Sequence, residues 1–244
     1  MRRGFGPAVS NRILRFGGVS FSPADVPGLA LWLDANESAT TYQASGGARA
    51  AADGDVLGYW MDKSGNAKHA SQDTTSKKPT RRLVTANNKT FWAARFDGVD
   101  DAILSAVTVS QPSTIFAVAK VTSGAGDVFD GQSASNRHLL RPGSNIIHAG
   151  ASLTTAAAGT IYAVHAAVFN GAASKHRLNN ASLVTGNAGT QDMTAGMCIG
   201  AGLSGAQEFL NGEVVSVLVY SGEKDEATQT AIAGYLASIV GISL

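Results

Sequence analysis

The sequence predicts an all-β fold, an antiparallel sandwich of two sheets, preceded by an extended arm and closed by one C-terminal helix. From Pro27 onward, short apolar runs alternate with clusters of Gly, Asn, Asp and Ser, which is typical of a chain that reverses direction every few residues. Charged residues make up only 15% of the 244 residues and 28 are glycine, a balance that fits a folded β-protein. The chain has no repeat of fixed period, which disfavours solenoids and propellers and leaves a sandwich.

Seven segments are the strongest strand candidates: residues 29–35, 56–62, 91–97, 113–121, 160–169, 196–201 and 213–221. In TIFAVAKV (114–121) both alternating faces are largely apolar, so we expect a central strand that is covered on both sides. RLNNASL (177–183) places Asn179 and Asn180 between strand-like flanks. Because asparagine tolerates the positive φ of tight turns, this segment predicts a hairpin.

Near the C-terminus the spacing of the apolar residues differs from that of the predicted strands. Apolar pairs recur there every four residues: Ala231 with Ile232, Tyr235 with Leu236, and Ile239 with Val240. This spacing marks one face of an α-helix. Acidic residues gather between 223 and 226, where carboxylates complement the positive end of the helix dipole. We therefore expect one C-terminal helix that packs on the sheets.

Residues 1–26 are predicted to form the arm and residues 27–244 the sandwich domain. The first 22 residues carry four arginines and no acid, with scattered apolar residues between glycines. A frayed terminus is one interpretation. The other is an arm that orders against another subunit, because its apolar side chains would otherwise lie in water. The residues that would make these contacts are Arg2, Arg3, Phe5, Arg12, Ile13, Leu14, Arg15 and Phe16.

Bulk properties exclude several classes of partner. The formal net charge is +1 and no basic stripe is present, so nucleic acid is not expected to bind. No run approaches the roughly 18 apolar residues of a membrane-spanning helix, so membrane insertion is not expected. Cys198 is the only cysteine, which rules out an internal disulfide and the usual cysteine-based zinc sites. The N-terminus lacks the apolar stretch of an export signal.

The stretch RFDGVDD (95–101) holds Asp97, Asp100 and Asp101 around one glycine, which suits a calcium site, a pair of catalytic carboxylates, or a turn. Asp-Gly is a strong turn signal, and carboxylates accept hydrogen bonds from turn amides, so the turn is favoured. In DKSGN (62–66), Asp62 opens a second arrangement of oxygen donors, for which an Asx turn is again the favoured alternative. Calcium is the one cofactor that these acids would suit, and no other is expected.

The sequence predicts no catalytic residue. Retaining glycanases need two carboxylates about 5 Å apart, and on a strand this requires acids at alternate positions. No such alternation occurs, so we expect that the chain is not an enzyme. GLSGA (202–206) also falls short of the nucleophile elbow of hydrolases.

Sugar binding usually combines an aromatic ring with polar side chains that fix the hydroxyl groups. Trp32, Trp60 and Trp92 lie inside apolar runs, where a core position is favoured over a binding platform. GQSASNRHLLRPGSN (131–145) offers polar chemistry without an aromatic residue. We take its Asn136, Arg137, His138 and Arg141 as the candidate glycan-binding residues.

The order of the segments resembles a known family. The segments that carry the resemblance are PGLALWLDA (27–35), YWMDKSGNAKHASQ (59–72), RFDGVDDAIL (95–104), STIFAVAK (113–120), FLNGEVVSVLVYSG (209–222) and YLASIVGI (235–242). They are similar to concanavalin A-like, laminin G-like jelly-roll domains of bacterial and bacteriophage proteins, over about residues 27–244. The resemblance implies an antiparallel jelly roll, often carbohydrate-binding or adhesive, with glycanases among its relatives. Ser216 stands where the family pattern leads us to expect an acid.

The resemblance further implies a noncatalytic bacteriophage structural protein, an appendage, fibre or decoration of the head or tail, whose lectin-like domain adheres to host-surface glycans. The arm would contact other virion proteins, and the chain would form a homo-oligomer, for which we expect a trimer. Its location would be the virion, assembled in the host bacterial cytoplasm. The alternatives are a carbohydrate-binding module or adhesin of a bacterial protein and a glycoside hydrolase.

Overall fold

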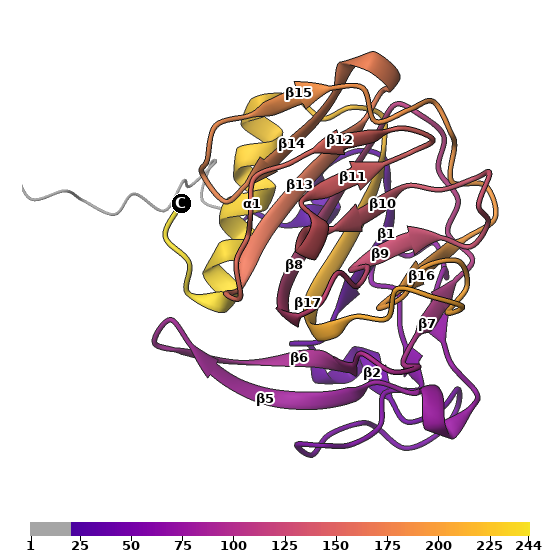
Figure 1. The fold of residues 1–244 in the computed structure, drawn as a ribbon. Coiled ribbons are helices and arrows are strands. Elements are labelled where there is room, and N and C mark those ends of the chain that lie inside the picture. Colours follow the sequence, from indigo (N-terminus) through magenta and orange to yellow (C-terminus); the bar gives the residue numbers. More distant parts are fainter. Residues whose placement is uncertain (1–20) are drawn as a thin grey trace, which may run out of the picture.

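The computed structural model describes residues 21–244. Two antiparallel sheets face one another, and the helix α1 (Glu226–Val240) lies on the outer side of one of them (Figure 1). The predicted all-β sandwich with one C-terminal helix is confirmed. No helix in this range has the length and apolar character needed to cross a membrane.

The first sheet has eight strands, in the order β15-β14-β13-β8-β17-β6-β5, and β1 also pairs with β17. The long strand β17 is shared along its length, because its first residues pair with β6 and its later residues pair with β1. The strands are β1 (Leu29–Asp34), β5 (Thr80–Ala86), β6 (Lys89–Asp97), β8 (Ser113–Ser123), β13 (Ala163–Phe169), β14 (Ser174–Leu178), β15 (Val184–Gly186) and β17 (Asn211–Ser221).

The second sheet has nine strands, in the order β12-β11-β10-β9-β16-β7-β4-β3-β2, each only two or three residues long. They are β2 (Thr41–Tyr42), β3 (Tyr59–Trp60), β4 (Ala70–Ser71), β7 (Ile103–Ser105), β9 (Phe129–Gly131), β10 (Leu139–Arg141), β11 (Ile146–His148), β12 (Ser152–Thr154) and β16 (Met197–Ile199). Short 3-10 turns connect the elements at Pro23–Asp25, Ser38–Thr40, Thr75–Lys77, Pro142–Ser144 and Gly171–Ala173.

Strand β8 is central, as its sequence predicts, and lies between β13 and β17. Ile115 faces the space between the sheets, and Phe116 faces the helix; both side chains are fully buried. The predicted hairpin is also present, with β14 and β15 joined by a turn in which Asn179 has a φ of 51°. Both predictions succeeded because they depend on local periodicity and turn chemistry.

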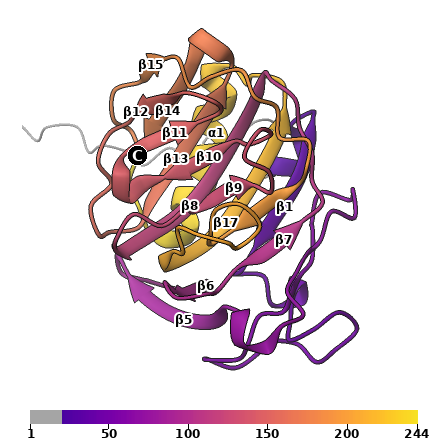
Figure 2. The same cartoon turned by 45° about the vertical axis from the view of Figure 1, so that its right-hand side comes forward.

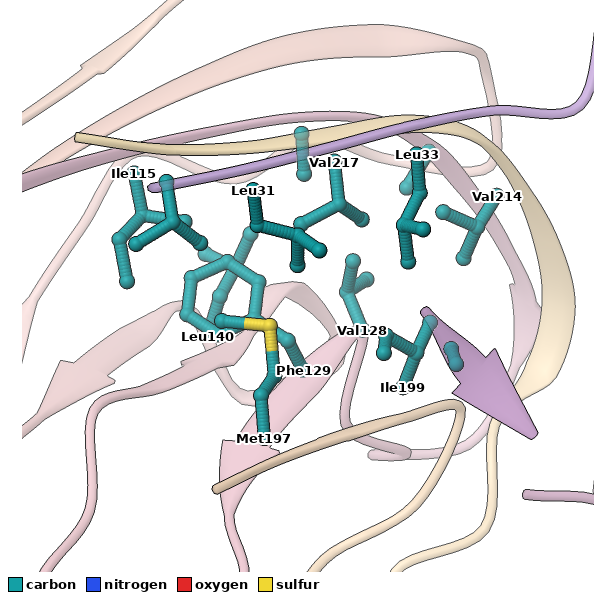
Figure 3. Packing of buried hydrophobic residues seen from close by; sticks show 14 of the residues in the cluster. Leu31, Leu33, Ile115, Val128, Phe129, Leu140, Met197, Ile199, Val214 and Val217 are labelled. Carbon is teal, nitrogen blue, oxygen red and sulfur yellow. The ribbon is translucent and has the colours of Figure 1, made fainter. Parts of the chain in front are cut away.

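Two apolar layers hold the fold together. The inner layer lies between the sheets and includes Leu31, Leu33, Ile115, Val128, Phe129, Leu140, Met197, Ile199, Val214 and Val217 (Figure 3). The outer layer lies between the eight-stranded sheet and α1, and its helix residues include Ile232, Leu236 and Val240. Asp225 caps the start of the helix, since its carboxylate accepts a hydrogen bond from the Thr228 amide at 2.7 Å, and the helix ends before Gly241, which has the left-handed conformation.

Ser216 and the end of the predicted arm both join segments that are distant in the sequence. Ser216, in the place of an expected acid, donates its hydroxyl to the Leu33 carbonyl at 2.7 Å where the register of β17 shifts, so it joins β17 to β1. Phe21 and Val26, assigned to the arm, pack on the outer layer, and the Tyr220 hydroxyl donates to the Pro23 carbonyl. The proposed contact residues of the arm, from Arg2 to Phe16, lie outside the described residues.

Candidate functional site

The β9–β10 hairpin gathers two acid–arginine pairs on the outer face of the nine-stranded sheet. Arg137 donates from Nε and Nη2 to the two carboxylate oxygens of Asp130, at 2.9 and 2.6 Å. Arg141 donates in the same way to Asp127, at 2.6 and 3.1 Å. The carboxylates have no exposed surface, whereas the arginine side chains keep 13% and 16% of theirs. We name these four residues the Asp–Arg site.

The local path of the chain explains why the two aspartates share a face although they are three residues apart. Val128 and Phe129, which separate them, both point into the inner layer. The Val128 amide donates to the Leu140 carbonyl at 3.0 Å, and Phe129 faces Leu140 in the ladder. This break in the usual alternation turns Asp127 and Asp130 to the same side.

The segment 202–208 lies against the Asp–Arg site. The Leu203 amide donates to Asp130 Oδ2 at 3.2 Å. Glu208 Oε1 lies 3.3 Å from Arg141 Nη1, and the Glu208 carbonyl accepts the Asp127 amide. The site is thus held by charge-assisted hydrogen bonds from two parts of the chain.

Burial controls the protonation of the acids. It raises the pKa of Asp127 to about 7, against the lowering effect of Arg141. It also raises the pKa of Asp130, and Arg137 opposes this shift. Desolvation disfavours the charged carboxylate, and each guanidinium favours it, so each arginine opposes the protonation of its partner.

His148, on β11, belongs to the same neighbourhood. Burial lowers its pKa, and the positive charges of Arg137 and Arg141 lower it further, which favours the neutral imidazole. Its Nδ1 lies 3.1 Å from the Ser152 hydroxyl. The surroundings therefore combine two guanidiniums, three carboxylates including Glu208, and a neutral imidazole, with no excess of positive charge.

The structure brings together two of the four residues proposed from the sequence to bind a glycan, Arg137 and Arg141. Asn136 is half-buried and closes the turn before β10, where its amide donates to the Ser133 carbonyl at 3.1 Å. It adjoins the Asp–Arg site through Arg137. The polar chemistry predicted for this segment is thus centred on the two arginines.

His138, which directly precedes β10, points the other way, because neighbouring residues of an extended chain face opposite sides. It has no exposed surface and stacks on Phe169, with ring centroids 4.3 Å apart. Its Nε2 lies 2.8 Å from the Gln191 carbonyl, and Nδ1 lies 3.2 Å from the Ser113 hydroxyl. The sequence-based assignment of His138 to the glycan-binding surface is therefore corrected: it is a core residue.

Asp127, Asp130 and His148 are not among the site residues predicted from the sequence. The sequence does carry a signal for the two aspartates. Asp130 and Arg137, which are closer together in the sequence, form one pair, and Asp127 and Arg141, which flank them, form the other, as expected for two chain segments that run antiparallel. Opposite charges on paired strands stabilise one another, so this pattern predicts the pairs. Nothing in the local sequence indicates that His148 lies beside them.

The three acids of RFDGVDD also come together, with one oxygen of each within 4.8 Å of the others. Asp97 Oδ1 accepts the Val99 amide at 2.8 Å, and Asp101 Oδ2 accepts the Asp97 amide at 3.0 Å. Burial raises the pKa of Asp101 to about 6, and the charges of Asp97 and Asp100 add to this rise. The geometry is that of a turn whose carboxylates bind its own amides, and calcium stays a prediction.

Asp62, the other calcium candidate, ties the loop 62–68 to β1. Its Oδ1 accepts the Trp32 and Ser64 amides at 2.9 and 2.8 Å. Its Oδ2 accepts the Lys68 amide and the Ser64 hydroxyl at 3.0 and 2.7 Å. Four hydrogen bonds from the chain therefore already use the oxygens that a cation would need.

The three tryptophans lie away from the Asp–Arg site. Trp60 is in the inner layer and Trp32 is in the outer layer beneath α1. Trp92, on β6, is half-buried, and the Arg81 guanidinium lies 4.0 Å from its ring centroid. A tryptophan platform beside the two arginines is thus excluded.

Comparisons with family models and with curated proteins give no match, but solved structures resemble the chain. An α-L-arabinofuranosidase of family GH54 has a TM-score of 0.63 and 13% identity, over 89% of this chain and 63% of that chain. The binding domain of Paraclostridial mosquitocidal protein 1 has a TM-score of 0.58 and 11% identity, over 87% and 53% of the two chains. Trypanosoma rangeli sialidase has a TM-score of 0.57 and 11% identity, over 93% and 36%.

At these identities the likeness shows the fold, which is that of glycosidase and binding-domain sandwiches. This chain spans less than two thirds of each of these proteins. The prediction that the chain is not an enzyme is contradicted by the comparison, because two of these three structural neighbours are glycosidases. That prediction depended on the lack of alternating acids, whereas Asp127 and Asp130 share a face at a spacing of three.

Proposed function

We propose that the chain recognises glycans and binds them on the outer face of the nine-stranded sheet, at the Asp–Arg site. The observation that carries this proposal is the pair of arginines, Arg137 and Arg141, whose side chains are partly exposed and whose guanidiniums each donate two hydrogen bonds to a buried carboxylate. A fixed guanidinium is a planar set of donors, which suits adjacent sugar hydroxyls and loses little entropy on binding. The fold, shared with glycosidases, supports the same conclusion.

The charges around the site favour an uncharged sugar. The three carboxylates of Glu208 and the two buried aspartates outnumber the two arginines, so no unpaired cation is left to attract a carboxylate or sulfate. Hydrogen bonding to hydroxyls is then the main polar interaction. We expect neutral arabinoxylan or arabinan to bind more tightly than sialyllactose, measured by titration calorimetry with each.

Arg141→Lys tests the site with little change in charge. Lysine keeps the positive charge beside Asp127 but loses the planar two-point donor, so glycan affinity should fall about tenfold or more. Arg82→Lys is the matched control, because Arg82 pairs with Asp53 on the exposed part of β5, in the other sheet. Equal affinity of both variants and the unmodified protein would contradict the proposal.

Glycoside hydrolysis is a second candidate, favoured by the two aspartates. A carbon placed on Gly202 would lie 2.7 Å from Asp127 Oδ2 and 3.3 Å from Asp130 Oδ2. The two oxygens are therefore at most about 6 Å apart, an upper limit that includes the roughly 5 to 5.5 Å of retaining glycosidases. An acid with a pKa of about 7, as for Asp127, can donate a proton at neutral pH.

Both carboxylates are buried, so hydrolysis would require segment 202–208 to move away from them. Release of 4-nitrophenol from 4-nitrophenyl α-L-arabinofuranoside measures the reaction. Turnover that disappears in Asp127→Asn and Asp130→Asn, but not in Asp97→Asn, would support it. Turnover that survives in both of the first two variants would exclude these residues as the catalytic pair.

The virion remains the proposed location, with the predicted arm of residues 1–26 as the segment that contacts other virion subunits and a trimer as the oligomer. This part of the proposal depends on the family resemblance and on the composition of those residues. Light scattering of the full chain and of a chain that begins at Phe21 tests it, since the shorter chain keeps the Phe21 and Pro23 contacts. A full-length monomer that does not join phage particles would contradict it.

A further inference from the structure

One row of residues crosses the outer face of the nine-stranded sheet and ends at the Asp–Arg site. Directly opposed residues of antiparallel strands share a face. The register pairs Tyr42 with Tyr59, Tyr59 with Ser71, Ser71 with Leu104, Leu104 with Cys198, and Cys198 with Asp130. The far end of this row, on β2 and β3, is therefore aromatic.

Three rings gather at that end, from Tyr42, Tyr59 and His69. The centroids of Tyr42 and Tyr59 lie 6.3 Å apart, and those of Tyr59 and His69 lie 5.3 Å apart. The guanidinium carbon of the exposed Arg49 is 6.0 Å from the Tyr42 centroid. All three rings are half-buried, so each keeps surface that a ligand can cover. We name Tyr42, Tyr59 and His69 the aromatic patch.

The aromatic patch also has polar atoms. The Asp62 amide donates to His69 Nδ1 at 3.0 Å, so the proton of the neutral ring lies on Nε2, where it can be donated. The tyrosine rings combine an apolar body with a hydroxyl at the tip. Apolar faces beside donors and acceptors are the combination that recognises the face of a sugar ring and its hydroxyls.

The middle of the row is more apolar. Leu104 and Phe209, both half-buried, pack with the buried Cys198 between the aromatic patch and the Asp–Arg site. Phe209 comes from the same connection as Leu203, whose amide binds Asp130. A ligand that passes from one end to the other would therefore contact Phe209.

We propose that the aromatic patch is a second contact for a glycan bound at the Asp–Arg site, and that the ligand is a chain of several sugars rather than a single one. The inference rests on the proposed function. Tyr59 on β3 and Asp130 on β9 are separated by four strand-to-strand steps. At about 4.8 Å for each step, the two ends lie on the order of 19 Å apart, which one sugar cannot span.

The test compares arabinoxylan polymer with its short fragment arabinofuranosyl-xylobiose, each titrated into the full chain. Tyr59→Ala should weaken binding of the polymer about tenfold and leave binding of the fragment unchanged. Tyr59→Phe keeps the ring and should bind the polymer within about twofold of the unmodified protein. Leu83→Ala, at an exposed position of β5 in the other sheet, is the matched control and should bind as the unmodified protein does.

Thermal unfolding midpoints of the variants show whether each is folded. If Tyr59→Ala is not folded, Tyr42→Ala, which removes the neighbouring ring of the aromatic patch, replaces it and should weaken polymer binding in the same way. Polymer binding by Tyr59→Ala that equals that of the unmodified protein would overturn the inference and leave the proposed function intact. If the unmodified protein binds neither probe, while Arg141→Lys also changes nothing, the proposed function fails and the inference fails with it. An equal loss for polymer and fragment would also overturn the inference.

Discussion

The two outer faces of the sandwich are completed in different ways. On the eight-stranded sheet, α1 lies over the strands and buries Ile232, Leu236 and Val240 completely. Figures 1 and 2 show this helix behind β13, with β9, β10 and β11 on the opposite side of the molecule. That opposite face carries guanidiniums and carboxylates that bond to one another, and within residues 21–244 no α-helix lies over it.

Under the proposed function, the difference separates the face that stabilises the fold from the face that recognises a ligand. Apolar area removed from water stabilises the helix-covered face without requiring particular partners. Buried ion pairs are weak evidence for stability, because apolar residues of similar volume often hold a fold as well. The two ion pairs of the Asp–Arg site are better explained by orientation, because each aspartate holds its arginine in a fixed position on the outer face of the nine-stranded sheet, here called the open face.

The largest expected effect is on the helix-covered face. Leu236→Ala removes a fully buried side chain between α1 and the sheet, so the free energy of unfolding should fall by about 2 to 5 kcal/mol. Urea unfolding followed by circular dichroism measures it. Leu83→Ala, 48% exposed, should change it by less than about 0.5 kcal/mol. If the free energy of unfolding falls by less than about 1 kcal/mol in Leu236→Ala, the packing of the helix contributes little to stability.

The next largest effect is expected at acid pH and comes from His138, whose ring stacks on Phe169 in the inner layer between the two sheets. Burial lowers the pKa of His138 to about 4, below its usual 6.5, so its stabilising contribution is complete above pH 6.5 and is lost as the pH falls toward 4. The loss amounts to about 3 kcal/mol. His138→Gln cannot be charged, and its unfolding free energy should fall less over this range.

Unfolding in urea at several pH values compares His138→Gln with the unmodified protein. His176, also buried with a pKa of about 4, remains in the variant, so part of the acid sensitivity should persist. Asp127 acts in the opposite sense, because its raised pKa favours the folded state at low pH. Parallel pH profiles for the two proteins would contradict the assignment of His138.

The smallest effect should come from the open face. Arg141→Ala leaves the Asp127 carboxylate without its guanidinium, which should cost about 1 to 3 kcal/mol at pH 8. The cost should shrink at pH 5, because Asp127 then takes up a proton and no longer needs a counter-charge. Arg82→Ala, which breaks the exposed pair with Asp53, should cost less than about 1 kcal/mol at either pH. Equal costs at pH 5 and pH 8 would show that Arg141 does not control this charge.

The sequence by itself determined the class of fold and its most regular parts. Local sequence determines the apolar faces of β8, the turn at Asn179 and the apolar spacing of α1, because backbone preference and periodicity act over a few neighbouring residues. The short strands β9 to β12 were not identified, because segments of three residues carry too little pattern.

Only the tertiary structure decided the site. Asp127 and Asp130 share a face because Val128 and Phe129 both enter the inner layer, and this depends on what the opposite sheet offers them. For the same reason, the His138 side chain lies in the core, whereas the neighbouring Arg137 side chain lies at the surface. Which side of a short strand is buried is fixed by the packing of distant segments, so local sequence could propose the residues but not their partners.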